Sequence, residues 1–252
     1  MCSLSLSIPA GAAPLAARLQ LPTPCRGLVV FVHGSGSDHR SPRNRAVAAR
    51  LEQASLATLL FDWLTADEQR HGVTCSSEIA LASDRLLACL AWLDSRIELQ
   101  PLLPLGLFGA STGAAAALHV AAARPERIAA LVCRGGRLDL AADALPRVSA
   151  PTLLVVGSRD PAVLALNRQA AEQLHCRHRL AVVPGAGHLF AEPGCLEALG
   201  VLARDWFLHH LPATASPGED QAGRGEDAGD SGERSRRTDQ RPAPSPLPGR
   251  GS

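Results

Sequence analysis

No stretch of this 252-residue sequence is apolar for long enough to cross a membrane. A membrane span needs about 18 consecutive apolar residues, and no run here approaches that length. The first residues, MCSLSLSIPAGAAPLAA, also lack the basic segment and the unbroken apolar segment of a secretory signal peptide. The sequence therefore predicts a cytoplasmic protein without a membrane partner.

Lysine is absent, and all 25 basic residues are arginine. Because alanine, leucine, proline and glycine are also used heavily, we interpret this absence as coding bias rather than as chemistry. The basic residues are balanced by 24 acidic residues, which leaves a formal net charge of +1. A nucleic-acid-binding surface usually needs a clear basic excess, so we expect no nucleic-acid partner.

The sequence has no C-x-x-C pair, although it contains seven cysteines. Their odd number and wide spacing indicate free, mostly buried thiols in a reducing compartment rather than a disulfide framework. His175, Cys176 and His178 lie close together, but no second group of potential ligands accompanies them. We therefore expect no metal site and no other cofactor.

The composition changes after Leu211. Between Ala213 and Ser252 the one bulky aliphatic residue is Leu247, among many proline, glycine, serine, arginine and acidic residues. Such a segment cannot bury enough apolar surface to offset the entropy lost on ordering, so we expect residues 213–252 to form a disordered low-complexity tail. Residues 1–212 are long enough and apolar enough to form one domain.

Short apolar runs alternate with segments of helical pattern within residues 1–212. Continuous apolar runs of this length are typical of parallel strands covered by helices on both faces. The runs lie at 27–32, 57–61, 105–108, 128–133, 151–156 and 180–183, and the helical segments at 41–54, 78–97, 112–124, 161–174 and 194–210. Period-two alternation at 4–8 and 15–21 indicates an edge hairpin. The sequence therefore predicts an α/β fold with a mostly parallel central sheet and helices on both faces.

The run 105–108 is followed by Gly109-Ala110-Ser111-Thr112-Gly113, a match to G-x-S-x-G. Between a strand and a helix, this pattern places the serine at the tip of a strained turn, with its hydroxyl clear of the sheet. Glycines on both sides avoid collisions with the neighbouring strand and helix. The start of the helix also directs free N–H groups toward an oxyanion formed beside Ser111. The pattern therefore indicates a nucleophilic serine.

Three other loops at the predicted carboxyl ends of strands carry groups that such a serine requires. Asp160 ends the segment Gly-Ser-Arg-Asp after the fifth buried strand, and His188 ends Pro-Gly-Ala-Gly-His after the last one. The segment His-Gly-Ser-Gly after the first buried strand contains Gly34 and Ser35, either of which could direct a backbone N–H toward that of Thr112. Reactive groups of such sheets gather at this edge. An imidazole can take the serine proton near neutral pH, and a buried carboxylate fixes its tautomer.

The segments GASTG, GSRD and GAGH, in the order Ser, Asp, His and preceded by HGSGS, resemble the α/β-hydrolase superfamily. The closer likeness is to its small dienelactone-hydrolase-like members, and it covers about residues 3–211. The resemblance implies that Ser111 is the nucleophile. It also implies that His188 is the general base and then the general acid, with Asp160 as the carboxylate that orients it.

The same resemblance implies an oxyanion hole formed by the backbone amides of Thr112 and Ser35, with Gly34 as the alternative to Ser35. Dienelactone hydrolases proper use a cysteine nucleophile, whereas this sequence has Ser111 at that position. Hydrolases of this fold commonly carry a lid after the fourth parallel strand. Only about 13 residues separate Arg137 from the fifth strand, so we expect no large cap domain and an open site.

Several of these residues have competing interpretations. His188 could be a loop histidine that bonds to a backbone carbonyl. Asp160 could cap the helix that begins at Pro161, and Asp139 is a second candidate for the carboxylate that orients His188. His33 is expected to fix the oxyanion loop by hydrogen bonds rather than to act as a base.

Candidates for contact with the substrate lie in a predicted polar loop, 62–75, and at the end of the fourth buried strand. Trp63 and Leu64 could supply an apolar wall, and Arg134 and Arg137 could hold an anionic group of the substrate. The alternative for the two arginines is that they are solvated or ion-paired.

These features together predict a serine hydrolase that cleaves a small carboxylic ester, lactone or thioester through an acyl-enzyme on Ser111. The alternative is a non-catalytic binding module that keeps the α/β-hydrolase fold. The presence of all three candidate catalytic residues argues against that alternative. Neither the natural substrate nor the oligomeric state is encoded by a motif.

Overall fold

The computed structural model describes residues 2–10, 13–71, 75–96 and 103–212. The tail expected at 213–252 lies outside the described residues, so its disorder stays a prediction. Within the described ranges no helix combines the length and the apolar character that crossing a bilayer requires.

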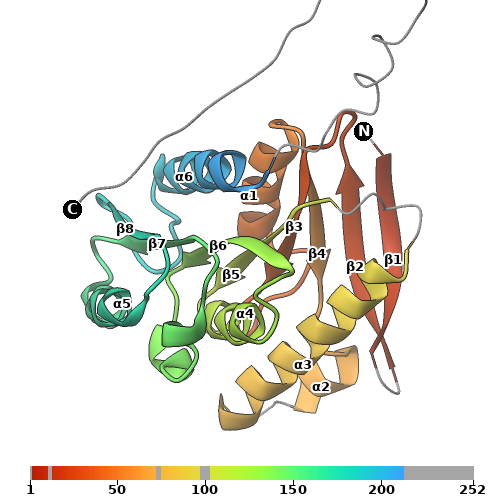
Figure 1. Cartoon of the computed structure of the whole chain (residues 1–252), viewed down its shortest axis with the longest axis horizontal. Coiled ribbons are helices and arrows are strands. Elements are labelled where there is room, and N and C mark those ends of the chain that lie inside the picture. The colour runs from red at the N-terminus through yellow and green to blue at the C-terminus, as the bar shows by residue number, and fades with distance from the viewer. Residues whose placement is uncertain (1, 11–12, 72–74, 97–102, 213–252) are drawn as a thin grey trace, which may run out of the picture. The chain divides into compact units, whose positions relative to one another are not determined.

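The described strands form one mostly parallel sheet (Figure 1). In chain order they are β1 (Cys2–Ala10), β2 (Ala13–Leu21), β3 (Gly27–Val32), β4 (Leu56–Phe61), β5 (Leu105–Ala110), β6 (Ile128–Arg134), β7 (Thr152–Gly157) and β8 (His178–Val183). Their order across the sheet is β1-β2-β4-β3-β5-β6-β7-β8. Strands β3 to β8 pair in parallel, and the β1–β2 hairpin joins β4 antiparallel at the edge. The predicted sheet and edge hairpin are therefore confirmed.

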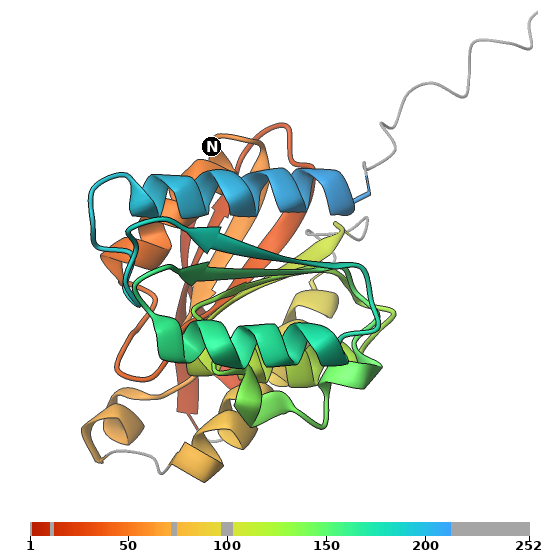
Figure 2. The same cartoon turned by 90° about the vertical axis from the view of Figure 1, so that its left-hand side faces the viewer.

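Helices cover both faces of the sheet, as predicted (Figures 1 and 2). They are α1 (Pro42–Glu52), α2 (Ala66–His71), α3 (Cys75–Asp94), α4 (Thr112–Ala123), α5 (Pro161–Gln173) and α6 (Cys195–His210). Helices α1 and α6 pack together on one face, while α3, α4 and α5 lie on the other. Because helices cover both faces, β3, β4, β5 and β7 are buried along their whole length.

The predicted polar loop at 62–75 contains the short helix α2, so the expectation of a loop is wrong in this part. A reciprocal pair of hydrogen bonds begins the helix. Thr65 Oγ1 accepts from the Glu68 amide at 3.2 Å, and Glu68 Oε2 accepts from the Thr65 amide at 2.8 Å. This arrangement is a capping box, which satisfies N–H groups that a helix start otherwise leaves free.

The strand order brings the loops of interest to one edge of the sheet. Strand β3 lies between β4 and β5, so the chain moves outward from β3 in both directions. Ligands of open parallel sheets bind beside the carboxyl ends of the strands at such a reversal. The connection from Arg137 to Pro151 forms two short 3-10 turns, Leu138–Ala141 and Leu145–Arg147, and no cap domain. The edge is therefore left uncovered, as the sequence predicted.

Candidate active site

Ser111 lies at the sharp turn between β5 and α4, with backbone angles φ 53° and ψ −120°. Non-glycine residues seldom adopt positive φ, because their Cβ then crowds the backbone. Flanking glycines allow the turn. A Cβ on Gly109 would lie 2.5 Å from Cα of Ala114, and one on Gly113 would lie 2.2 Å from the carbonyl oxygen of Val32. This is the strained turn that the pattern around Ser111 predicted.

His188 and Asp160 form a direct side-chain contact. Nδ1 of His188 lies 2.7 Å from Oδ2 of Asp160, within hydrogen-bonding distance. Asp160 precedes the first residue of α5, but its side chain makes no capping hydrogen bond. The structure therefore favours the interpretation of Asp160 as the hydrogen-bonding partner of His188 over its interpretation as a helix cap. A carboxylate that accepts a hydrogen bond from Nδ1 keeps the proton of the neutral imidazole on that atom. Nε2 is then free to accept a proton.

Asp139 is held by a different residue. Its two carboxylate oxygens accept from Nε and Nη2 of Arg137 at 2.9 and 2.7 Å. These hydrogen bonds lower the pKa of Asp139 below its ordinary value. The structure thus brings Asp160, and not Asp139, to His188. Arg137 is ion-paired, which is the alternative that the sequence left open for it.

The segment from Arg134 to Arg137 connects Ser111 to His188. The Ser111 amide donates to the Arg134 carbonyl at 3.0 Å, and the Arg137 amide donates to the Ser111 carbonyl at 3.1 Å. Nη1 of Arg134 donates to the His188 carbonyl at 2.9 Å. Gly135 has φ 53°, and a Cβ there would lie 3.3 Å from Nδ1 and Cε1 of His188. The imidazole therefore lies against the same segment that holds the backbone of Ser111.

The loop after β3 approaches the serine turn closely. A Cβ on Gly34 would lie 2.9 Å from the Ala110 carbonyl oxygen and 3.0 Å from Cβ of Ser111, so glycine is required there. The Ser35 amide donates to Oγ1 of Thr112 at 3.0 Å, and the two hydroxyl oxygens are 2.9 Å apart. The Ser35 amide is thus beside Thr112, but it bonds to the Thr112 hydroxyl, so the predicted oxyanion hole of the two amides stays a prediction. A role in an oxyanion hole requires that hydroxyl to move away.

Trp63 supports this loop from the inside. Its side chain is fully buried, Nε1 donates to the His33 carbonyl at 2.9 Å, and its ring stacks on that of His33 with centroids 5.4 Å apart. The prediction that Trp63 forms a wall of the substrate pocket is wrong, because the neighbouring core takes up its large apolar surface. Leu64, the other predicted wall residue, does line a pocket.

His33 is buried, and its Nδ1 lies 3.0 Å from the Gly34 carbonyl oxygen. Burial lowers the pKa of His33 below its ordinary value, against smaller opposing effects of the Gly34 carbonyl and of Asp62. Its position agrees with the expected structural role in the loop.

Arg134 is buried rather than solvated, with 7% of its surface exposed. Its guanidinium lies 5.9 Å from the centre of the Phe190 ring and donates to the His188 carbonyl. Burial, with a smaller contribution from Arg43, lowers the pKa of Arg134 to about 10. Arg134 therefore holds the loop that carries His188, a role that its sequence position did not predict.

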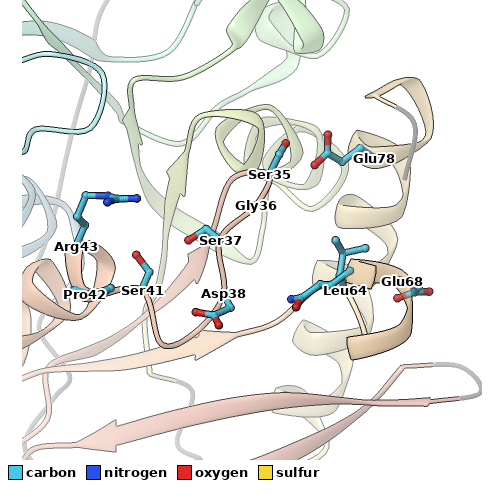
Figure 3. A pocket seen from close by; sticks show the side chains of 11 residues that line it. Ser35, Gly36, Ser37, Asp38, Ser41, Pro42, Arg43, Leu64, Glu68 and Glu78 are labelled. Carbon is cyan, nitrogen blue, oxygen red and sulfur yellow. The ribbon is translucent and has the colours of Figure 1, made fainter. Parts of the chain in front are cut away.

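A pocket of about 680 Å³ opens beside the loop after β3 (Figure 3). Residues 35–38, the first turn of α1 and side chains from α2 and α3 form its wall. Ser35 belongs both to this wall and to the contact with Thr112, the residue after Ser111. The pocket therefore adjoins the serine turn.

Glu192 is a site residue that the sequence analysis missed. Its Oε2 accepts from the Gly187 amide at 3.0 Å, and this bond is the main reason that the pKa of Glu192 lies below its ordinary value. A Cβ on Gly187 would lie 2.9 Å from Oε1 of Glu192. Glu192 thus fixes the turn immediately before His188. A lone glutamate five residues after a glycine carries no recognisable motif.

The described cysteines are free thiols, with Cys89 and Cys133 in the core. Burial raises the pKa of the Cys133 thiol to about 12, which makes it unreactive at neutral pH. Among the residues described, no group of three or more histidine, cysteine and acidic side chains is suited to hold a metal ion.

Comparison with known proteins relates this fold to hydrolases. A model of the alpha/beta hydrolase domain matches residues 25–197. A solved structure of a dienelactone hydrolase from Anabaena variabilis is 47% identical with a TM-score of 0.80, and the match covers 84% of this chain and 99% of that one. Est1E from Butyrivibrio proteoclasticus, solved with ferulic acid bound, shares the fold at 17% identity with a TM-score of 0.71, over 81% and 98% of the two chains.

Among curated proteins, the chain is 51% identical over 206 residues to a protein of Mycobacterium tuberculosis, strain H37Rv, that is provisionally named a phosphoribosyl transferase. The match covers 82% of this chain and 46% of that protein. The chain therefore spans about half the length of the curated relatives it matches.

Proposed function

Because the chain belongs to the α/β-hydrolase family, we propose that it is a serine hydrolase that cleaves small carboxylic esters, lactones or thioesters through an acyl-enzyme on Ser111. In this proposal His188 is the general base and acid, and Asp160 orients its imidazole. The main support for this proposal is the backbone conformation of Ser111. A non-glycine residue held at φ 53° costs about 1–3 kcal/mol, and such strain persists mainly where function requires it.

Acylation begins when Oγ of Ser111 attacks the carbonyl carbon of the substrate, while its proton passes to Nε2 of His188. The carbonyl electron pair moves to oxygen and forms a tetrahedral oxyanion. The Thr112 amide donates a hydrogen bond to this oxyanion, and a second comes from the Gly34 amide or, once the Thr112 hydroxyl has moved away, from the Ser35 amide. The intermediate then collapses, and the alcohol or thiol leaves with the proton from His188.

Deacylation repeats these steps with water as the nucleophile. Nε2 of His188 removes one proton from the water, and the oxygen adds to the acyl carbon. The second tetrahedral intermediate expels Oγ of Ser111, which regains the proton from His188. The carboxylate of Asp160 stabilises the imidazolium in both halves of the reaction. The products are a carboxylic acid and an alcohol or thiol, or a single hydroxy acid from a lactone.

The name of the Mycobacterium tuberculosis relatives describes a different chemistry. We assign the named phosphoribosyl transfer to the part of those proteins outside the match, because the matched part corresponds to the hydrolase domain of this chain. Incubation of this chain with phosphoribosyl pyrophosphate and nucleobases is expected to give no nucleotide. Formation of a nucleotide would contradict this assignment.

Hydrolysis of 4-nitrophenyl butyrate and of a lactone panel tests the proposed function. Ser111→Ala is expected to lower kcat at least about 10³-fold, because the nucleophile is lost. Ser83→Ala is the matched control, since its hydroxyl bonds within helix α3 to the Ile79 carbonyl and it is expected to change kcat less than about twofold.

Turnover that persists in Ser111→Ala would remove Ser111 from the mechanism. Absence of turnover with every ester, thioester and lactone would favour the alternative, a binding module that keeps the fold.

A further inference from the structure

The pocket beside residues 35–38 has a cationic side that the proposed acyl transfer does not use. Ser37, Ser41 and Arg43 line this side. Figure 3 shows both hydroxyls and the guanidinium on the same side of the loop, with Glu68 and Glu78 on the other side. These three hydrogen-bond donors are therefore separate from Glu68 and Glu78, although the carboxylate of Asp38 lies beside Ser37 and Ser41 (Figure 3).

Arg43 is a partly buried cation that forms no ion pair within the part of the chain that the structure describes. Its Nε is shielded from solvent without a hydrogen-bond partner, and it forms no ion pair with a carboxylate of the described residues. Shielding a charged donor without a partner is unfavourable, so such groups are normally paired. Nε of Arg43 therefore has no acceptor among the described residues.

The position of Arg43 in the first turn of helix α1 is also unfavourable for a positive charge. The first turn of α1 contains Arg43 and Arg45 and no acidic residue. A helix N-terminus carries a partial positive charge, which repels cations and attracts anions. Stability of the helix therefore does not explain an arginine at this position.

Arg134 is a second cation within electrostatic reach. Its guanidinium is buried, donates to the His188 carbonyl and is paired with no described carboxylate. The positive charge of Arg43 contributes, after burial, to the lowered pKa of Arg134. The two arginines are therefore close enough for their charges to interact, and Arg134 also contacts the loop of the proposed catalytic histidine.

None of the acidic residues that line the pocket forms an ion pair with Arg43 or Arg134. Oδ1 of Asp38 accepts from the Arg40 amide at 2.8 Å. Oε1 of Glu68 accepts from Arg85 at 3.0 Å. Glu78 lies across the loop from Arg43 (Figure 3). Glu68 and Glu78 therefore disfavour an anion on their side of the loop, whereas the other side has the cation Arg43 with Asp38 as its one nearby carboxylate.

We propose that the Arg43 side of this pocket binds a phosphate or carboxylate group of the substrate, so that the enzyme prefers anionic esters to neutral ones. The guanidinium of Arg43 supplies charge-assisted donors, and the hydroxyls of Ser37 and Ser41 supply two more. The inference rests on the proposed function, because it assigns the substrate class of the same site. Ser111 and His188 do not line the pocket, and Ser35, which does, connects it to the serine turn through its contact with Thr112.

Two chromogenic esters of similar length test the preference, 4-nitrophenyl hemisuccinate, which is anionic, and 4-nitrophenyl pentanoate, which is neutral. The wild-type protein is expected to favour the hemisuccinate in kcat/KM by about tenfold or more. Arg43→Gln is expected to lower this ratio to about one by reducing hemisuccinate turnover, with the pentanoate changed less than about threefold. Ser37→Ala is expected to lower the ratio partially.

Arg45→Gln is the matched control, because Arg45 lies in the same helical turn but is exposed to solvent. It removes the same charge from the same helix without touching the pocket. The ratio is expected to stay within about twofold of the wild-type ratio. An equal loss of preference in Arg45→Gln and Arg43→Gln would show that the preference comes from long-range charge rather than from contact in the pocket. That result would overturn the proposed site.

Inhibition of pentanoate hydrolysis identifies the anionic group. A lower inhibition constant for n-propyl phosphate than for butyrate assigns the site to phosphate, and the reverse order assigns it to carboxylate. Each inhibitor is expected to weaken about tenfold or more in Arg43→Gln. Equal inhibition by both anions and by neutral 1-butanol, unchanged in Arg43→Gln, would overturn the proposal.

Failure of this proposal is distinguishable from failure of the proposed function. Equal cleavage of both esters by Ser111 would leave a serine hydrolase without an anion site. If neither ester is cleaved, the Tm of the wild-type protein, measured with and without each anion, tests the anion site without any turnover. A rise with n-propyl phosphate that Arg43→Gln abolishes supports the site, and no rise with either anion overturns it.

Discussion

Nδ1 of His188 lies 2.7 Å from Oδ2 of Asp160, although the two residues are 28 positions apart in the sequence. They follow β8 and β7, which are parallel neighbours, so their loops leave the same edge of the sheet side by side. Asp139 leaves the neighbouring strand β6 and is held by Arg137 instead. Strand order alone allowed either acid beside His188, and in the structure Asp139 pairs with Arg137 while Asp160 pairs with His188.

Replacing Asp160 by asparagine is expected to lower kcat by about 10⁴-fold with little change in fold. The amide keeps the shape of the side chain but favours the wrong imidazole tautomer and cannot stabilise the imidazolium. Steady-state ester hydrolysis at neutral pH measures the effect. Asp139→Asn is the control and is expected to lower kcat less than about tenfold. A larger loss in Asp139→Asn than in Asp160→Asn would reverse the assignment.

Replacing Ser111 by glycine is expected to make the protein more stable while abolishing its activity. Glycine adopts φ 53° without the strain of a Cβ, which is worth about 1 kcal/mol or more. For a domain of this size, that corresponds to a rise of about 2–4 °C in Tm. Ser111→Ala keeps the Cβ and is the matched control, since it loses the same hydroxyl. Equal Tm values for the two variants would show that the turn is not strained.

Replacing Thr112 by valine is expected to lower Tm, because valine keeps the shape but leaves the Ser35 amide without its acceptor. A hydrogen bond of this kind contributes about 0.5–1.5 kcal/mol, which corresponds to a few degrees in Tm. Thr112→Ser keeps the hydroxyl and is expected to retain most of the stability. Calorimetry on the three proteins measures the difference. An unchanged Tm in Thr112→Val would mean that this contact does not hold the loop.

Stability is expected to fall as the pH drops below about 6.5 because of His33. Its pKa in the folded protein lies below the ordinary value of 6.5, so the unfolded chain binds the proton first. Stability is therefore retained above pH 6.5 and lost between that value and the folded-state pKa, by at most about 1.4 kcal/mol per pH unit. Asp62, Asp38 and His39 face the ring and shape the same profile.

Urea unfolding at several pH values measures this slope, and His33→Gln supplies the comparison. The variant is expected to be less stable at neutral pH but to have a shallower dependence on pH between 5 and 6.5. An identical slope in both proteins would assign the acid sensitivity to other groups.

Much of the fold follows from short-range patterns. The six apolar residues of Gly27–Val32 are bounded by Arg26 and His33, so both ends of β3 could be predicted from the sequence. The strained turn at Ser111 was predictable for a similar reason, since its flanking glycines are local requirements of the backbone. Helix α2 was missed although its capping box, Thr65 and Glu68, is a local signal within a polar segment.

Other features depend on contacts between distant segments. Trp63 was expected to line the pocket, but packing on His33, 30 residues earlier, turns its ring into the core. The effect of Arg43 in α1 on the pKa of Arg134 at the end of β6 likewise joins two elements that are far apart in the sequence. No periodicity or motif describes such pairs, because each is set by the tertiary packing of separate elements.

Mass spectrometry after treatment with a fluorophosphonate probe tests the central claim most directly. The probe reacts with a serine hydroxyl only where a base activates it and an oxyanion hole stabilises the adduct. We expect one adduct per chain, on the peptide that contains Ser111, and none on Asp160→Asn treated for the same short time. An unmodified wild-type protein, or an adduct on another residue, would contradict a catalytic role for Ser111.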